Sequence, residues 1–219
     1  MKAKRRRGLL IVLEGIDGSG KTTQARRLLG RLRYRGYEAV FFREPTRGKW
    51  GRAVKRMAAR DGSLTPEQEL DLFVQDRREN VARNLRPALT AGKVVVLDRY
   101  YFSTIAYQGA KGIDAGRIRR LNEAFAVRPD LVVVLDVEAG AGLARIRGRK
   151  TRDELFERED YLARVRSIFL GFKGPRIVHL DGRAARRAVA DAIWARVEPL
   201  LPTLSTFSSR RPRLRPGKD

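Results

Sequence analysis

The sequence predicts an α/β fold in which a doubly wound, parallel, five-stranded sheet is flanked by helices. Two observations lead to this prediction. Short apolar runs alternate with longer segments of helical spacing along most of the chain. The apolar runs are also continuous in Val, Leu and Ile rather than alternating with polar residues, which is typical of strands buried on both faces of a parallel sheet.

The individual elements follow from these patterns. The predicted strands lie at 9–14, 38–43, 93–98, 131–136 and 176–180. The predicted helices lie at about 21–34, 66–90, 114–125, 139–148, 159–172 and 183–200. The helix over 66–90 has a clear start signal, because Thr65 is a good cap and Pro66 is favoured in a first turn.

Composition narrows the class of protein. A chain of 219 residues suits a single α/β domain. Because cysteine is absent, the chain has no disulfide or thiolate metal site, and we expect it in a reducing cytoplasm. His179 is the single histidine, which excludes a multi-histidine site. The net charge of +23 indicates anionic partners such as nucleotides or nucleic acid, although a general arginine bias in the source would produce the same excess.

The ends of the chain differ from its middle. The apolar run from Leu9 to Leu13 is too short for a signal-peptide core or a membrane span, so we expect no membrane partner. The sequence therefore divides into a basic arm at 1–8, one domain at 9–201 and a basic tail at 202–219. The tail is rich in Ser, Pro and Arg, and we expect it to be disordered.

The segment "GIDGSGKT" is the strongest motif in the chain. It matches G-x-x-x-x-G-K-[ST] at every fixed position, and it lies between a predicted strand and a predicted helix. Glycines let backbone N–H groups turn towards phosphate oxygens, and the helix N-terminus adds partial positive charge. The motif predicts a nucleoside triphosphate site rather than a ligand-free glycine turn. The predicted ATP-binding residues are Gly15, Ile16, Asp17, Gly18, Ser19, Gly20, Lys21, Thr22 and Thr23.

Charged residues at the strand ends extend this site. Lys21 is expected to bridge the outer phosphates, and the Thr22 hydroxyl is expected to ligate Mg²⁺. Asp98 is the preferred second metal-linked acid, because Arg99 follows it; Asp136 competes for this role, and Asp98 could instead only cap a short helix. Arg43 and Arg99 could clamp a second phosphate group, which a simple hydrolase does not need.

From about Leu9 to Leu201 the sequence resembles the thymidylate kinases, which are P-loop nucleoside monophosphate kinases. The resemblance rests on the order and spacing of "EGIDGSGKTTQ", "REP", "LFVQDRRENV", "PALTAGKVVVLDRYYFSTIAYQG", "RPDLVVVLDV" and "FERED". It implies ATP-dependent phosphorylation of dTMP to dTDP for dTTP synthesis, by direct Mg²⁺-assisted transfer. ATP and dTMP are then the small-molecule partners, and the family is typically homodimeric.

The resemblance also implies roles for acceptor-binding residues. Phe73 stacks on the thymine ring and Arg77 hydrogen-bonds the base; the alternative is a core phenylalanine beside a solvated arginine. Arg99 holds the acceptor phosphate and Asp17 lies near the sugar and the metal. Tyr107 presses on the sugar where a 2′-hydroxyl would project. Ser103, Thr104 and Gln108 line the same pocket, and Arg43, Glu44 and Pro45 form its facing wall. Tyr100, Tyr101 and Phe102 have no assigned role and are expected to pack.

Some thymidylate kinases carry an arginine directly after the P-loop aspartate, but that residue is Gly18 here. Others supply arginines from a mobile lid, for which this chain has "RIRGRKTRDELFERE" at about 145–159. Arg149 and Arg152 are therefore chosen to reach the transferred phosphoryl group, against the alternative of a solvated basic helix end. The resulting catalytic set is Lys21, Asp17, Arg99, Arg149 and Arg152.

Two departures from the family pattern keep alternatives open. The chain reads "REPTRGKWG" where the family usually reads "REPGGT", and "DELFE" where it usually reads "DRFE". The first departure motivates a kinase for another nucleoside monophosphate. The net charge motivates a nucleic-acid-binding ATPase, although the motifs form a small pocket rather than an aromatic-interleaved basic stripe, so nucleic acid is not the expected partner. A regulatory nucleotide binder is disfavoured by the intact Lys21, Thr22, Asp98 and Arg99.

Overall fold

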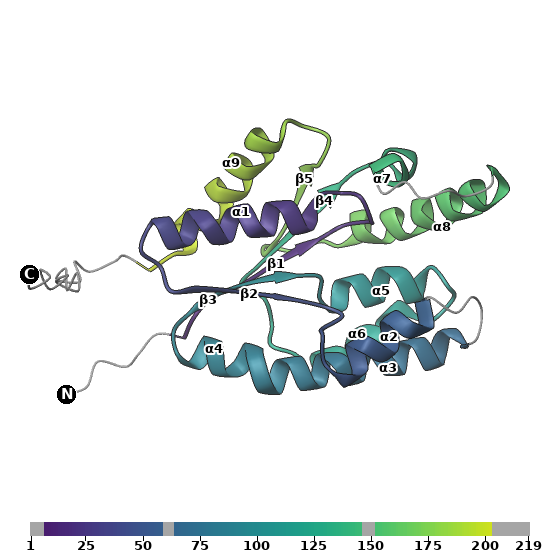
Figure 1. Cartoon of the computed structure of the whole chain (residues 1–219), viewed down its shortest axis with the longest axis horizontal. Coiled ribbons are helices and arrows are strands. Elements are labelled where there is room, and N and C mark those ends of the chain that lie inside the picture. The colour runs from purple at the N-terminus through teal and green to yellow at the C-terminus, as the bar shows by residue number, and fades with distance from the viewer. Residues whose placement is uncertain (1–6, 59–63, 146–151, 203–219) are drawn as a thin grey trace, which may run out of the picture.

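The structure is a computed structural model that describes residues 7–58, 64–145 and 152–202 (Figure 1). Its strands form one parallel sheet in the order β2-β3-β1-β4-β5. Their bounds are β1 (Leu10–Glu14), β2 (Ala39–Arg43), β3 (Val94–Asp98), β4 (Leu131–Asp136) and β5 (Ile177–Asp181). The predicted fold class is confirmed, and each strand lies within one residue of its predicted bounds.

Helices cover both faces of this sheet, as Figure 1 shows. Their bounds are α1 (Lys21–Tyr34), α2 (Lys49–Ala58), α3 (Pro66–Asn80), the π-helical turn η1 (Val81–Leu85), α4 (Arg86–Thr90), α5 (Tyr101–Gly109), α6 (Ala115–Glu123), α7 (Ala139–Arg145), α8 (Arg152–Gly171), α9 (Arg186–Val197) and the 3₁₀ turn η2 (Glu198–Leu200). None of the helices in the described ranges is long and apolar enough to cross a membrane.

The central strand β1 separates two hydrophobic cores. Leu10 and Val12 belong to the core beneath α3–α6 and α8, whereas Ile11 and Leu13 belong to the core beneath α1 and α9. This division follows from the alternation of side chains along a strand. It confirms that the continuous apolar runs mark strands buried on both faces, because β1 and β3 are buried at every position.

Besides α5, three helical regions differ from the sequence prediction. The helix predicted over 66–90 is interrupted by η1, directly before the segment that contains Pro87, which cannot donate a backbone hydrogen bond. Helix α8 begins at Arg152 rather than near residue 159, and helix α2 was not predicted. The Thr65 cap is confirmed, with a capping box between Thr65 and Gln68.

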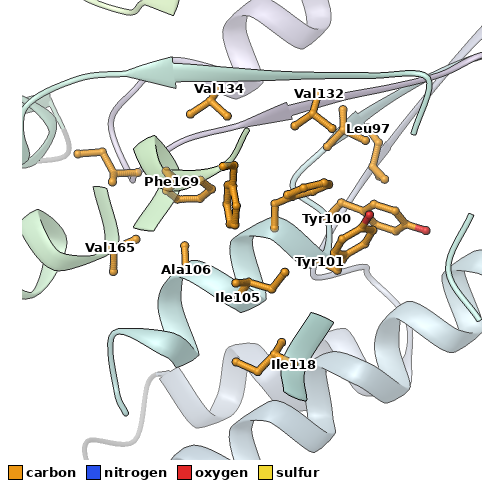
Figure 2. Close-up of a cluster of buried hydrophobic side chains, with 14 of the residues drawn as sticks. Leu97, Tyr100, Tyr101, Ile105, Ala106, Ile118, Val132, Val134, Val165 and Phe169 are labelled. Carbon is orange, nitrogen blue, oxygen red and sulfur yellow. The ribbon is translucent and has the colours of Figure 1, made fainter. Parts of the chain in front are cut away.

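The segment "DRYYFSTIAYQG", for which the sequence predicted no helix, is largely helical. Its helix α5 is buried at most of its positions and packs against α3, α6 and α8, with Ala106 beside Val165 and Phe169 and Ile105 beside Ile118 (Figure 2). Tyr100, Tyr101 and Phe102 are buried in the same core, and the rings of Tyr101 and Phe102 stack at a centroid distance of 4.4 Å. The expectation that these three residues pack is confirmed.

Strand register brings the predicted polar residues to one edge of the sheet. Asp98 at the end of β3 is aligned with Arg43 of β2 and with Leu13 of β1. Glu14 follows Leu13, and the P-loop starts at the next residue. The carboxyl ends of parallel strands form the usual ligand site of an α/β sheet, so we expect the ligand site at this edge.

Candidate active site

The P-loop connects β1 to α1. Gly15, Gly18 and Gly20 all have positive φ angles, of 133°, 79° and 93°, which residues with a side chain rarely adopt. Lys21 is buried, and its ammonium group donates a 2.7 Å hydrogen bond to the Ile16 carbonyl. The loop therefore wraps around its own lysine at the N-terminus of α1, which is the geometry of a phosphate cradle. Thr23, also predicted to bind ATP, is exposed on α1.

Gly18 has no room for a side chain. A Cβ atom at this position would overlap the backbone carbonyl of Gly142 in α7, and a Cβ atom on Gly142 would lie 2.6 Å from the Asp17 carbonyl oxygen. The two backbones approach each other because both positions are glycine. An arginine after the P-loop aspartate would not fit this arrangement, which agrees with the expectation that catalytic arginines come from elsewhere.

We expect Gly18→Ala to weaken ATP binding and to destabilise the protein. The left-handed conformation costs alanine about 1–2 kcal/mol, and the added methyl group must also displace α7 or the P-loop. Denaturant unfolding and the KM for ATP measure the two effects. The matched control is Gly112→Ala, because Gly112 has a φ of 97° with nothing within 4 Å of its Cβ position. The control should lose stability alone; an unchanged KM for ATP in Gly18→Ala would contradict the expectation.

Thr22 and Asp98 lie together at the entrance to the cradle. The Thr22 hydroxyl donates a 2.6 Å hydrogen bond to Asp98 Oδ2, and Arg43 Nε lies 3.6 Å from the same oxygen. Asp98 is fully buried, and its Oδ1 has no hydrogen-bond partner among the described residues. A buried carboxylate oxygen without a partner is costly, and it fits a bound cation.

Asp136, the competing acid, is already engaged. Its two carboxylate oxygens accept hydrogen bonds of 2.6 and 2.9 Å from Arg166 of α8. This bidentate pair neutralises Asp136, which supports the choice of Asp98. No group of three or more metal-ligating side chains occurs in the part of the chain that the structure describes. A metal here would need oxygens from a nucleotide as well, as Mg²⁺ commonly does.

Arg99 joins the P-loop to helix α5. Its guanidinium group donates hydrogen bonds to Asp17 Oδ1 at 2.6 Å, to Ser103 Oγ at 2.8 Å and to the Tyr107 hydroxyl at 3.2 Å. The Tyr107 hydroxyl also accepts a 3.0 Å hydrogen bond from the Asp17 backbone N–H. Four of the predicted residues, Asp17, Arg99, Ser103 and Tyr107, therefore form one connected polar cluster beside the P-loop.

Burial and neighbouring charges shift several pKa values in this cluster and in its neighbours Lys21 and Glu14. Burial lowers the pKa of Lys21 and raises the pKa of Glu14. Burial alone would raise the pKa of Asp17, but the Arg99 and Lys21 charges outweigh it and the pKa falls. Burial alone would lower the pKa of Arg99, but Tyr107 and Asp17 outweigh it and the pKa rises. Arg99 therefore keeps its positive charge, and Asp17 its negative charge, at neutral pH.

The two predicted base-binding residues, Phe73 and Arg77, lie on α3. Their burial is the reverse of what a core phenylalanine beside a solvated arginine would show. Phe73 is partly exposed, whereas Arg77 is only 1% exposed and lies among polar side chains. Its guanidinium group donates to Glu44 at 2.8 Å, to Asn122 at 2.6 Å and to Thr104 at 3.0 Å. A core phenylalanine beside a solvated arginine is therefore wrong. An oriented arginine beside an accessible aromatic ring suits recognition of a planar base.

The facing wall follows β2. Glu44 is buried, and it accepts hydrogen bonds from Arg77 and Asn80, whereas Pro45 is half-buried and Arg43 remains 54% exposed. Thr46, where the sequence departs from the family pattern, donates from its N–H and its hydroxyl to Asp76 at 2.8 and 2.6 Å. The departure thus ties this loop to α3. Gln108 is buried and points its amide group at Glu69 over 3.4 Å.

The predicted lid is only partly described. Arg149 lies outside the described residues. Arg152 is the first residue of α8, but the structure does not describe the surroundings of its side chain. Within the predicted lid range, Arg145 donates to the backbone carbonyls of Gly18 and Gly182 at 3.2 and 3.3 Å. From α8, the Tyr161 hydroxyl donates to the Tyr107 carbonyl at 2.9 Å.

Sequence reasoning did not assign four residues that contact this site: Glu14, Asn122, Arg145 and Tyr161. Glu14 could have been singled out, because it is an acid at the end of an apolar run, directly before the P-loop. Asn122 gave no signal, because an asparagine on an amphipathic helix is ordinarily solvated. Its contact with Arg77 spans 45 residues of sequence.

The fold and the site together are those of a P-loop kinase of the nucleoside monophosphate class, with a phosphate cradle beside a polar cluster that contains Arg99. The thymidylate kinase family model matches residues 13–193. A thymidylate kinase of Akkermansia muciniphila is 48% identical over 84% of this chain and 89% of its own. One of Xanthomonas oryzae pv. oryzae is 47% identical over 84% and 78%, and a probable thymidylate kinase of Archaeoglobus fulgidus is 42% identical over 88% and 96%. The chain belongs to the thymidylate kinase family, and the expected resemblance is confirmed.

These comparisons give no support to the alternative functions considered from the sequence. All three relatives carry the same activity in their names, and none is named as a kinase for another nucleotide or as a nucleic-acid-binding ATPase. The coincidence of motif order, family match and sheet topology makes this chain a transferase that uses a nucleotide.

Proposed function

We propose that this protein phosphorylates dTMP to dTDP by direct transfer of the γ-phosphoryl group of ATP, with Mg²⁺ as the metal. One observation carries the proposal: Asp17 of the P-loop is hydrogen-bonded to Arg99 and to Tyr107 of the neighbouring pocket. The donor cradle and the acceptor pocket are therefore adjacent and joined by side chains. This adjacency suits a reaction in which two phosphate groups meet without a covalent enzyme intermediate.

In the proposed reaction an oxygen of the dTMP phosphate attacks the γ-phosphorus of ATP. The bond to the β–γ bridging oxygen breaks, and ADP leaves. Lys21 at the cradle stabilises charge on the phosphate oxygens of the donor, and Arg99 does so on the acceptor. Thr22 and Asp98 would hold Mg²⁺, which supplies further positive charge to the phosphates. Arg149 and Arg152 remain the proposed lid arginines.

The pocket on α3 and α5 determines the proposed acceptor. Phe73 would stack on the thymine, and the oriented Arg77 guanidinium would hydrogen-bond its edge. Tyr107 would lie against the sugar, favouring deoxyribose. The remaining proposed pocket residues are Arg43, Glu44, Pro45, Ser103, Thr104 and Gln108. Asp17 would lie near the sugar and the metal.

A coupled assay of ADP release tests this proposal. We expect release from ATP to depend on dTMP and to be faster with dTMP than with dUMP, dCMP, dGMP or dAMP. A different preferred acceptor would contradict the assignment of dTMP. ADP release stimulated by DNA instead of a monophosphate, and suppressed steeply by salt, would favour the nucleic-acid-binding alternative.

Asp98→Asn is expected to raise the Mg²⁺ concentration for half-maximal activity by about 10- to 100-fold. The amide keeps the size of the side chain and its contact with Thr22 but removes the charge at the buried oxygen without a partner. Titration of Mg²⁺ after EDTA treatment measures the shift. Asp136→Asn is the matched control, because Asp136 is neutralised by Arg166. An equal or larger shift in the control would assign the metal to Asp136.

The cellular setting is part of the proposal. The lack of cysteine in the chain supports a reducing, cytoplasmic location. Family resemblance supports a homodimer, which sedimentation at several protein concentrations would test. The proposed domain limits are 9–201, with the basic segments 1–8 and 202–219 outside the catalytic unit.

A further inference from the structure

Glu14 is a fully buried carboxylate at the end of β1, directly before the P-loop. It accepts three hydrogen bonds: from the Tyr100 N–H at 2.7 Å, from the Ser103 N–H at 3.2 Å and from the Ser103 hydroxyl at 2.6 Å. A buried carboxylate is costly unless it is well satisfied, and all three donors belong to the start of α5. All three of these hydrogen bonds to Glu14 therefore come from the N-terminal end of α5.

The contact supplies α5 with a cap from another element. The N-cap residue Tyr100 makes no side-chain cap hydrogen bond, and the N-terminal N–H groups of a helix need acceptors. Glu14 provides such acceptors, from a strand that lies 86 residues earlier in the chain.

The residue that this cap holds in place is Arg99. Arg99 has a φ of 70°, the one positive value at a residue other than glycine in the described ranges. Such a conformation persists only where the surroundings enforce it. Strand β1 holds the turn on both sides, because Arg99 N–H donates to the Leu13 carbonyl at 3.1 Å and Tyr100 N–H donates to Glu14.

A second connection between Glu14 and Arg99 runs through the side chain of Ser103. The Ser103 hydroxyl donates its proton to Glu14 and accepts a 2.8 Å hydrogen bond from Arg99 Nη1. Because the Ser103 hydroxyl hydrogen points at Glu14, a lone pair of the Ser103 oxygen is left to accept the hydrogen bond from the guanidinium group. Glu14 thus orients Arg99 through Ser103, while Asp17 holds the other guanidinium nitrogen at 2.6 Å.

We propose that Glu14 is a positioning residue that holds Arg99 in the orientation needed to bind the acceptor phosphate, through Ser103 and the α5 N-terminus. This inference rests on the proposed function of Arg99 as the acceptor clamp. Glu14 immediately precedes Gly15, so the same residue also sets the distance between the clamp and the donor cradle. Its loss is expected to impair acceptor binding more than donor binding.

Calorimetric titration with dTMP alone, and separately with a non-hydrolysable ATP analogue, tests this inference without requiring turnover. Glu14→Gln keeps the side-chain size but replaces one acceptor oxygen by a donor. We expect the Kd for dTMP to rise about tenfold or more, the scale of a hydrogen bond to a charged group. We expect the Kd for the analogue to change less than about threefold, because the P-loop glycines and Lys21 are untouched. Glu198→Gln on η2 is the control for an exposed glutamate.

A double-mutant cycle with Ser103→Ala separates positioning from a direct contact of Ser103 with dTMP. If Glu14 acts through Ser103, the double variant binds dTMP about as weakly as either single variant. Additive losses, or equal losses for both ligands, would overturn the inference. If Glu14→Gln does not fold, Ser103→Ala alone must weaken dTMP binding selectively and leave the analogue unaffected. A wild-type protein that binds dTMP but does not phosphorylate it refutes the proposed function only, whereas one that binds no dTMP refutes both.

Discussion

Lys21→Ala is expected to lower dTMP-dependent ADP release by about a hundred- to a thousandfold. This is the usual loss when one preorganised group that stabilises transition-state charge is removed. The Lys21 ammonium group is buried and held by the Ile16 carbonyl at 2.7 Å inside the loop, where it can reach phosphate without being screened by water. Single-turnover measurements with saturating ATP and dTMP separate this loss from weaker binding.

The control for this prediction is Lys173→Ala, which removes an exposed lysine between α8 and β5. The control should retain the activity of the wild-type protein. Thermal unfolding of Lys21→Ala should show a folded protein, because removing a buried lysine whose pKa is lowered by burial also removes a desolvation cost. Activity of the folded Lys21→Ala variant within tenfold of the wild type would contradict the assigned role.

The second large effect is expected from Arg99. Replacement by lysine keeps the positive charge but loses the planar fork that contacts Asp17, Ser103 and Tyr107 together. Arg99→Lys should lower kcat/KM for dTMP by roughly tenfold to a hundredfold, and Arg99→Ala by a further factor of about ten. The KM for ATP should change much less, since the P-loop backbone and Lys21 remain.

Steady-state kinetics with each substrate varied in turn measure this difference. The matched control is Arg83→Lys, because Arg83 lies on η1 and makes an exposed ion pair with Glu79. Exposed pairs of this kind contribute little, so the control should resemble the wild type. If Arg99→Lys impaired ATP and dTMP equally, Arg99 would be a general structural residue rather than an acceptor clamp.

Much of this molecule is determined by local sequence. Continuous Val and Leu runs specify β1, β3 and β4, because such runs are stable only when both strand faces are covered. The spacing of "GIDGSGKT" places a glycine turn before a helix without any distant contact. The position of Asp98 beside the cradle, in contrast, depends on the sheet order, which places β3 next to β1 although β2 comes between them in the chain.

Other features depend on contacts between distant segments. The spacing on α3 correctly places Phe73 and Arg77 on one helical face, but the burial of Arg77 requires Glu44, Thr104 and Asn122 from three other segments. The preference for Asp98 over Asp136 as the proposed metal ligand is supported by Arg166, which pairs with Asp136 from 30 residues further along the chain. The backbone of Gly142 in α7 leaves no room for a side chain at position 18. Nothing in the sequence around Gly142 predicts this close approach.

The segment "DRYYFSTIAYQG" shows both contributions. Its residue types alone indicate a polar pocket after a buried strand, and Asp98, Arg99, Ser103 and Tyr107 do lie beside the P-loop. Its aromatic residues have weak helix propensity, so sequence patterns do not predict α5. The helix forms because its apolar side packs against Val165 and Phe169 and because Glu14 caps its first turn. Local sequence thus determined the strands, the phosphate cradle and the chemistry of the site. Only tertiary contacts decided which polar groups are buried together, because those contacts join residues far apart in the chain.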